Sequence, residues 1–505
     1  SKITKQDVVE WANKYLGPES YAIIYKREGK DPDEQKIAAP KITPIVTNRD
    51  SQSEFLSEIQ TSQVQPIEPV FVDYKKDMSQ FEAQPGIDVL YKKNETNDIF
   101  TLIYVFNTGT ENDPALNLAF NYLSYLGTDK MTAEEIASEM YDIACSFYMN
   151  AGANQSSIQI TGLSENMGKA MEIVEGLIAG AKPDEAILEN CKADMLKSRA
   201  DAKLNQSRCF GALQRYLFYG GDFIRRTTLT DPALQALTSE QLLAKIGGLM
   251  GKQHEVLYYG PQKEAEVKSA LAEHHKVAAD LQPLEKKFST LLPTDANKVV
   301  LAQYDAKQLY YLQFSNRGEK FDVAADPEIT LYNEYFGGGM NTIVFQEMRE
   351  ARGLAYTAWA TLATPSNANG DYSYYAFIAT QNDKMQKAVE AFDDIINNMP
   401  ESEKAFGIAK EALVSRLRTE RTVKDGVLWS YLRARDLGLD APRDKQIFEK
   451  VQSMTLDDVK AAQQKWVKGR KYVYGILGDI QDLDLNYLKT LGPIQTVSQE
   501  EIFGY

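Results

Sequence analysis

The sequence predicts an α+β fold of two homologous domains, each with helices packed on one face of a largely antiparallel sheet. Two observations lead to this class. A block of one helix followed by one strand recurs at a spacing about the size of a domain. Between recurrences, short apolar strands come in neighbouring pairs, and long amphipathic helices follow them.

The recurring block is the main evidence for a duplication. It runs over residues 237–260, returns over 454–478 and also occurs over 3–25. The threonines that open its copies are 455 − 238 = 217 and 238 − 4 = 234 residues apart. These spacings are too long for a solenoid repeat. Three domain endings therefore accompany two complete domains.

Two further matches keep nearly the same offset. Residues 169–175 resemble 387–392, with 387 − 169 = 218, and residues 116–128 resemble 329–338. Similarity between unrelated helices would explain one match, but not several in register.

The repeat predicts the following division of the chain. Residues 1–28 are the closing helix and strand of a preceding domain that is cut short, and Thr4 is the expected N-cap of the helix. The remaining segments are a proline-rich linker between two halves over 29–75, a first complete domain over 76–275, a second over 290–485 and a tail over 486–505.

The elements of each domain follow from apolar periodicity. In the first we expect strands at 86–91, 100–106 and 157–160, and helices from 115, from 133, over 165–180 and over 184–218. In the second we expect strands at 299–302, 309–314, 354–362 and 371–379, and helices over 329–351 and 384–397.

Composition excludes several classes of function. The net charge of −15 argues against nucleic acid and anionic membrane surfaces, which are bound through clustered Lys and Arg. No apolar run reaches the roughly 18 residues that a membrane span needs.

Cysteine and histidine are too few and too scattered to predict a metal site within this chain. The three cysteines contain no Cys-x-x-Cys pair, and buried free thiols are expected. Adjacent His274 and His275 lie in a polar stretch and would point to different sides of a helix or strand. The complete set is Cys145, Cys191, Cys209, His254, His274 and His275.

One segment of the second domain carries a candidate site. Gly337, Gly338 and Gly339 allow positive φ and close backbone approach, and Gly353 suits the left-handed end of a helix. Arg349 would then lie in the last helical turn and Tyr356 on the strand that follows. A guanidinium and a phenol could converge on one point. A phosphate-binding loop is set aside because no Lys-Ser or Lys-Thr follows the glycines.

An alternative without a ligand is also open for these two side chains. An arginine near a helix C-terminus complements the helix dipole, and a strand tyrosine often packs in a core with its hydroxyl at the rim.

The run Gly-Gly-Gly-Met-Asn, then Phe-Gln-Glu-Met-Arg, then Arg-Gly-Leu-Ala-Tyr over 337–356 resembles the C-terminal half of the pitrilysin/insulinase-type zinc peptidases. Members of that family are built from repeated α+β domains that close like a clamshell. The resemblance implies that Arg349 holds substrate backbone carbonyls and that Tyr356 hydrogen-bonds the scissile carbonyl.

The zinc-binding motif of that family, His-x-x-Glu-His, has no match here. The corresponding positions are Leu118, Asn121 and Tyr122 in the first domain and Glu328, Leu331 and Tyr332 in the second, with Glu189 near the later acidic ligand. None of these sets can bind catalytic zinc. The resemblance therefore implies zinc in an N-terminal catalytic half, with peptides as substrates and this chain inactive alone.

Two other functions fit the same sequence. The chain could be a catalytically inert peptide-binding or scaffold subunit, or the partner subunit of a separate zinc-bearing chain. Because bacterial relatives of this kind are often exported, the resemblance favours the periplasm or cell envelope over the cytoplasm.

Overall fold

The computed structural model describes residues 3–17, 19, 21–27, 29 and 53–505, and it divides the chain into two compact units, Ser1–Gln65 and Pro66–Tyr505. Most of the linker predicted over 29–75 lies outside the described residues. The first unit contains helices α1 (Lys5–Tyr15) and α2 (Glu54–Thr61). Thr4 caps α1, as predicted. The strand predicted at 21–25 is absent, because no strand of the described chain pairs with these exposed residues.

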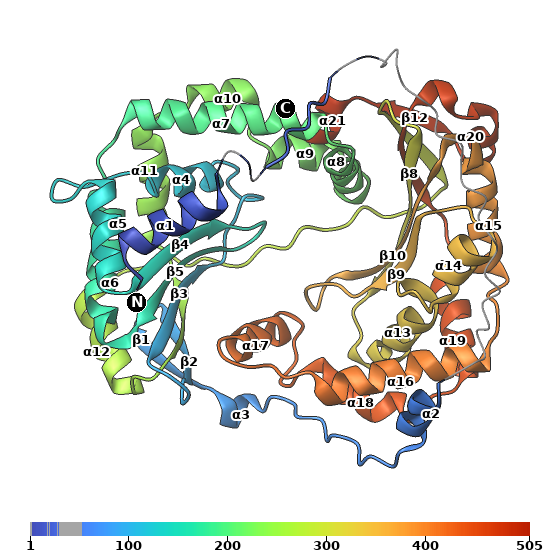
Figure 1. Cartoon of the computed structure of the whole chain (residues 1–505), viewed down its shortest axis with the longest axis horizontal. Coiled ribbons are helices and arrows are strands. Elements are labelled where there is room, and N and C mark those ends of the chain that lie inside the picture. The colour runs from blue at the N-terminus through green and yellow to red at the C-terminus, as the bar shows by residue number, and fades with distance from the viewer. Residues whose placement is uncertain (1–2, 18, 20, 28, 30–52) are drawn as a thin grey trace. The chain divides into compact units, whose positions relative to one another are not determined.

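The second unit contains two lobes, each built on a six-stranded sheet (Figure 1). The first sheet has the order β1-β2-β6-β3-β5-β4 and consists of β1 (Ser79–Gln84), β2 (Ile87–Lys93), β3 (Ile99–Phe106), β4 (Cys145–Ala151), β5 (Ser156–Leu163) and β6 (His254–Gly260). The second has the order β12-β7-β11-β8-β10-β9 and consists of β7 (Lys298–Gln303), β8 (Gln308–Lys320), β9 (Thr357–Ala363), β10 (Asp371–Gln381), β11 (Val473–Gly478) and β12 (Ile494–Val497).

The two sheets show the duplication directly. Strands β2, β6, β3, β5 and β4 pair in the same order and directions as β7, β11, β8, β10 and β9. In each sheet the late strand, β6 or β11, lies in the middle, parallel to one neighbour and antiparallel to the other. The predicted α+β class with two homologous domains is confirmed.

The outer edge strands differ between the lobes. β1 pairs antiparallel with β2, whereas β12 pairs parallel with β7. Residues 494–497, which the sequence assigned to a tail, thus add an edge strand to the second sheet.

Helices of the first lobe cover one face of its sheet and form its main core. They are α4 (Leu116–Leu123), α5 (Ala133–Asp142), α6 (Met167–Gly180), α7 (Glu185–Lys203), α10 (Asp231–Ala236), α11 (Ser239–Met250) and α12 (Glu264–His274). The single helix predicted over 184–218 is wrong. It breaks into α7 and α8 (Gln206–Tyr219), because the Asn205 side chain caps α8 by accepting from the amide of Arg208 at 3.0 Å.

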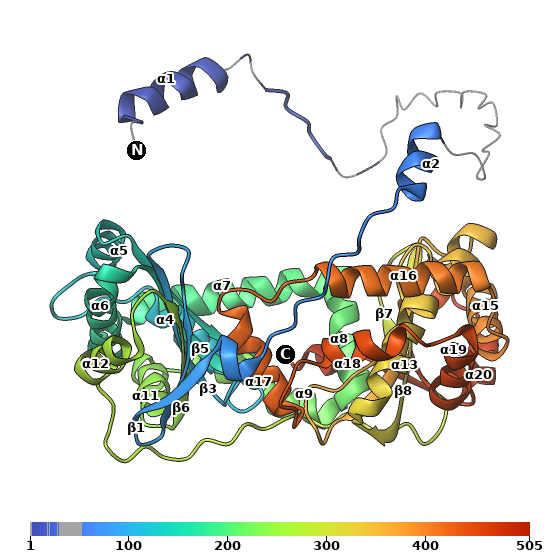
Figure 2. The same cartoon turned by 90° about the horizontal axis from the view of Figure 1, so that it is seen from below.

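The second lobe has an equivalent helical layer, of which Figure 2 shows α15, α19 and α20 together. Its helices are α13 (Asp326–Tyr332), α14 (Ile343–Phe345), α15 (Met385–Asn397), α16 (Glu403–Thr419), α18 (Arg443–Val451), α19 (Leu456–Ala462) and α20 (Leu485–Leu491). Short 3₁₀ turns lie at Ser164–Asn166, Val323–Ala325, Asn382–Lys384 and Ile480–Asp482, and a π-helical turn lies at Gln463–Val467.

One helix of each lobe packs on the sheet of the other lobe, on the face that the other lobe's own helices leave uncovered. Leu213 and Leu217 of α8 pack on β8, β10 and β11, and Gly475 in β11 gives the room, since a Cβ there would strike Leu217. In return, Leu428 and Leu432 of α17 (Gly426–Asp436) pack on β2, β3 and β6 of the first sheet. The remaining helices are α3 (Tyr74–Asp77), α9 (Gly221–Thr227) and α21 (Gln499–Phe503). Both faces of each sheet are therefore covered.

Candidate functional site

The glycine run belongs to an interrupted helix rather than to the continuous helix predicted over 329–351. α13 passes into a π-helical turn at Asn333–Gly337, and helix resumes only in α14 and a π-helical segment at Gln346–Ala351. Glycines favour such a break because they destabilise a helix interior.

Gly337 allows the backbone to approach β9 closely, but none of the three glycines adopts a positive φ. A Cβ at Gly337 would lie 2.6 Å from the carbonyl oxygen of Ala360, so only glycine lets this turn pack against β9. Gly338 and Gly339 have no such clash, with nearest atoms at 3.8 and 3.7 Å. None of the three has φ in the left-handed region, so that part of the prediction is wrong.

The end of the helical segment forms as the sequence indicates. Gly353 has φ +58°, and its amide donates to the carbonyl of Arg349 at 3.2 Å. Left-handed backbone at this position turns the chain sharply into β9. Tyr356 was predicted on the strand but lies immediately before it, since β9 starts at Thr357.

Arg349 and Tyr356 are brought together at the surface. The guanidinium carbon of Arg349 is 4.9 Å from the ring centroid of Tyr356 and 5.0 Å from that of Phe345. Cation–π contacts of this length hold an arginine in place. Tyr356 is 71% exposed, and within the described part of the chain Arg349 forms one ion pair, with Glu350 at 3.7 Å. Among the described residues, no hydrogen bond occupies the Arg349 guanidinium or the Tyr356 hydroxyl.

The positions that correspond to a zinc motif have other roles. Leu118 is buried in the core of the first lobe, and the buried Tyr122 donates to Ser239 at 2.8 Å. Asn121 is exposed and lines a cavity of about 570 Å³ together with Arg208 and Arg215.

The other candidate carboxylates are also engaged elsewhere. Glu189 pairs with Lys192 at 2.8 Å, and Glu328 accepts from Lys465 and Trp466 at 2.7 and 2.8 Å. Leu331 and Tyr332 are buried. Over the described ranges, no group of three or more His, Cys, Asp or Glu is placed to hold a metal ion. These residues do not fit a zinc site.

A buried histidine network was not predicted from the sequence. His254 and His275 approach at 2.8 Å between their Nε2 atoms, and His275 Nδ1 lies 2.5 Å from Glu175 Oε1. His254 Nδ1 faces the carbonyl oxygen of Lys252 at 2.7 Å, so it carries the proton and its Nε2 accepts from His275. Although its neighbours in sequence are polar, His275 is only 3% exposed.

Burial shapes the acid–base behaviour of this network. The pKa of His254 is lowered to about 4. Desolvation by burial is the larger cause, and the nearby His275 is the second. The ring of Tyr104 lies 4.2 Å from that of His275, and burial raises the pKa of Tyr104 well above its ordinary value. The network ties α6, β6 and the segment after α12 together inside the first lobe.

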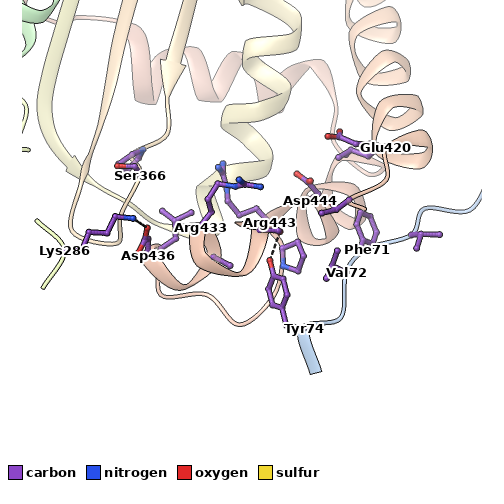
Figure 3. A pocket seen from close by; sticks show the side chains of 18 of the residues that line it. Phe71, Val72, Tyr74, Lys286, Ser366, Glu420, Arg433, Asp436, Arg443 and Asp444 are labelled. Atoms are coloured by element: carbon purple, nitrogen blue, oxygen red, sulfur yellow. Dashed lines mark hydrogen bonds and ion pairs between the residues drawn. The ribbon is translucent and has the colours of Figure 1, made fainter. Parts of the chain in front are cut away.

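A separate polar cavity of about 460 Å³ lies where α17 and α18 meet the segment before α3 (Figure 3). Its charges are largely paired, as Lys286 binds Asp436 at 2.6 Å and Arg443 binds Asp326. Tyr74 and Ser430 are 2.8 Å apart across it. Arg349 and Tyr356 do not line this cavity.

Comparison with known proteins shows similarity to zinc peptidases. Residues 253–413 match the family model described as peptidase M16 inactive domain. A protein of Rickettsia bellii named an uncharacterized zinc protease is 23% identical over 312 residues, which span 59% of this chain and 70% of that protein.

Two solved structures share the fold. A peptidase M16 inactive domain from Pseudomonas fluorescens gives a TM-score of 0.63 at 18% identity and covers 80% of this chain and 98% of its own. The periplasmic protease PqqL from Escherichia coli gives 0.61 at 13% identity and covers 94% of this chain, which spans 51% of the PqqL chain.

The chain thus shares its fold with M16 inactive domains, and residues 253–413 match the model of that domain. The resemblance to the C-terminal half of the pitrilysin/insulinase-type peptidases is thereby confirmed, and the chain carries an M16 inactive domain. No described helix has both the length and the apolar character needed to cross a bilayer.

Proposed function

We propose that this chain is the non-catalytic C-terminal half of a zinc-dependent endopeptidase that acts on peptides. It forms one wall of the closing chamber, while an N-terminal half supplies zinc and the general base. The convergence of Arg349 and Tyr356 at an exposed surface carries this proposal, since no hydrogen bond from a described residue occupies the donors of either side chain.

The chemistry of the pair suits a peptide carbonyl. Negative charge develops on the carbonyl oxygen during hydrolysis, and a positioned hydroxyl such as that of Tyr356 stabilises it. The guanidinium of Arg349 offers a planar fork of donors for a neighbouring backbone carbonyl. The contacts of Arg349 with Phe345 and Tyr356 fix its direction before substrate arrives.

The test uses the intact protein with both halves. We expect Arg349→Ala and Tyr356→Phe each to lower turnover of a peptide by about 10²-fold, the scale for loss of one oxyanion donor. Tyr356→Phe keeps the ring under Arg349, so it isolates the hydroxyl and should lower kcat more than it raises KM.

Matched controls separate this role from folding. Tyr148→Phe removes a hydroxyl from a tyrosine that is 64% exposed, and Arg225→Ala removes an arginine whose side chain is 71% exposed. Both should leave turnover and zinc content unchanged. Normal turnover in both site variants would contradict the assignment and favour an inert peptide-binding or scaffold subunit.

We also propose that the protein works in the bacterial cell envelope. The support is the fold shared with PqqL, whose description is periplasmic.

A further inference from the structure

Arginines gather around the cavity of about 570 Å³ that α4, α7 and α8 line, which we call the arginine cavity. Arg199 of α7 lines it, as do Arg208 and Arg215 of α8. Asn117 and Asn121 of α4 also line it, and because they are four residues apart they lie on one face of that helix. These helices belong to one compact unit, so the cavity does not depend on where residues 1–65 lie.

Arg199 is satisfied within the chain. Its guanidinium forms an ion pair with Asp231 and donates to the carbonyl oxygen of Leu229 at 2.6 Å. The ring centroid of Tyr505 lies 4.4 Å from its guanidinium carbon. These contacts occupy the side chain on several sides, so Arg199 shapes the wall of the cavity and leaves little capacity for a ligand.

Arg215 is held in the wall of the cavity without a carboxylate partner. Its Nη2 atom donates to the hydroxyl of Thr227 at 2.7 Å, and its guanidinium carbon lies 5.1 Å from the ring centroid of Phe223. In the described chain no acidic side chain forms an ion pair with it. Burial lowers the pKa of Arg215, and the charge of Glu111 offsets this only in part. A half-buried charge without a partner costs folding free energy, which favours a role in holding an anion.

Two further polar groups of the cavity lack a partner. The exposed side chain of Arg208 forms no hydrogen bond or ion pair with the residues that the structure describes. It lies 215 − 208 = 7 residues before Arg215, which is about two turns of the helix. The Oγ1 atom of Thr228 is buried and has no hydrogen-bond partner there. Asp194 is the only acidic side chain among the described residues that line the cavity, so positive charge is in excess.

We propose that the arginine cavity binds the C-terminal carboxylate of a peptide. Arg208 and Arg215 hold the two carboxylate oxygens, because a guanidinium offers a planar fork of donors. The hydroxyl of Thr228 supplies a further donor. The side-chain amides of Asn117 and Asn121 both donate and accept, which suits the peptide groups just before that terminus. A free phosphate would use the arginines but leave both amides unpaired.

The choice of a peptide as the ligand rests on the proposed function, whereas the unpaired arginines do not. Arg349 and Tyr356 do not line the arginine cavity, so the two proposals can be tested separately.

Calorimetry on the intact protein with both halves tests the site. The ligands are N-acetyl-alanyl-alanine with a free carboxylate, the same peptide with a C-terminal amide, and inorganic phosphate. We expect the amide to bind about 10–100-fold more weakly than the acid, the scale for losing hydrogen bonds to a charged group. Equal affinities for acid and amide overturn the proposal. Tighter binding of phosphate than of the acid peptide would assign the cavity to phosphate and also overturn it.

Variants of the two unpaired arginines place the binding in this cavity. Arg215→Met and Arg208→Gln should each weaken binding of the acid peptide by about 10–100-fold and leave binding of the amide unchanged. Arg225→Gln is the matched control, because Arg225 lies on α9, has a 71% exposed side chain and does not line the cavity. It should bind both peptides as the wild type does. An unchanged preference for the acid in both site variants overturns the proposal.

Thermal unfolding shows whether Arg215 only stabilises the fold. Because its guanidinium has no carboxylate partner, Arg215→Met should unfold at a temperature no lower than the wild type. A lower midpoint with unchanged peptide affinity would make Arg215 a structural brace and overturn the site. In Arg349→Ala the preference for the acid peptide should persist, so this site can fail without the proposed function failing. Loss of the preference in that variant would move the carboxylate to Arg349 and overturn the arginine cavity.

Discussion

Arg349 is held by aromatic rings and not by a carboxylate network, which matters for its proposed role. The guanidinium lies about 5 Å from two rings, and its nearest acidic group, on Glu350, is 3.7 Å away. Rings orient the charge without occupying its hydrogen-bond donors. The sequence run predicted Arg349 and Tyr356 together because they are close along the chain. It did not identify Phe345 as a partner, although the spacing of four residues places Phe345 and Arg349 on the same face of a helical segment.

The histidine network makes a prediction about pH. Burial lowers the pKa of His254 to about 4 in the folded chain, from an ordinary value of about 6.5 when unfolded. Between these values the unfolded chain binds a proton that the folded chain does not, so stability falls as pH falls through this window, by up to about 3 kcal/mol. Urea unfolding of His254→Gln between pH 4 and 7 should give a flatter dependence than the wild type.

His274→Gln serves as the control for this experiment. His274 lies outside the network, with its ring against Gly168. A wild-type slope is expected for it, and an unchanged slope in His254→Gln would contradict the assignment. The network was not predictable because Glu175 and His275 are 100 residues apart in sequence.

At the scale of elements, the exchanged helices α8 and α17 determine how the lobes support each other. A sequence stripe shows that a helix buries one side, but it does not say which sheet receives that side. The edge strands β1, β4 and β12 were also missed. In β1 and β4 exposed residues alternate with more buried ones, and in β12 two consecutive residues are exposed, so these edge strands give a weak apolar signal.

Cavities in the exchanged helices should loosen the opposite lobe. Leu213 and Leu428 are both 0% exposed, so truncation to alanine should cost about 2–5 kcal/mol each. Hydrogen exchange should speed up in β8 and β11 for Leu213→Ala, and in β2, β3 and β6 for Leu428→Ala. Leu204→Ala is the control, because Leu204 is 78% exposed. Loosening confined to the lobe that carries each helix in sequence would refute this reciprocal support.

For the whole molecule, the proposed compartment gives a measurable expectation. We expect the intact protein to be released with the periplasmic fraction on osmotic shock of bacteria that express it. A cytosolic enzyme should serve as the marker for cell lysis. Co-fractionation with that marker would contradict a cell-envelope location.

The duplication and the class of fold could be predicted for the two lobes, because the copies of one block keep their register over hundreds of residues. The contacts between residues far apart in the sequence could not be predicted. Leu90 and Ile103 of the first sheet, for example, pack on Leu428, which lies more than 300 residues further along the chain.

That exchange has a consequence during synthesis on the ribosome. The first sheet is complete once Gly260 has emerged, but the helix that covers its open face starts at Gly426, which is 426 − 260 = 166 residues later. At a synthesis rate of about 5–20 residues per second, this apolar face of the first sheet stays uncovered for roughly 8–33 s. The nascent chain is thus most exposed to aggregation, and most in need of a chaperone, in the interval between its two lobes.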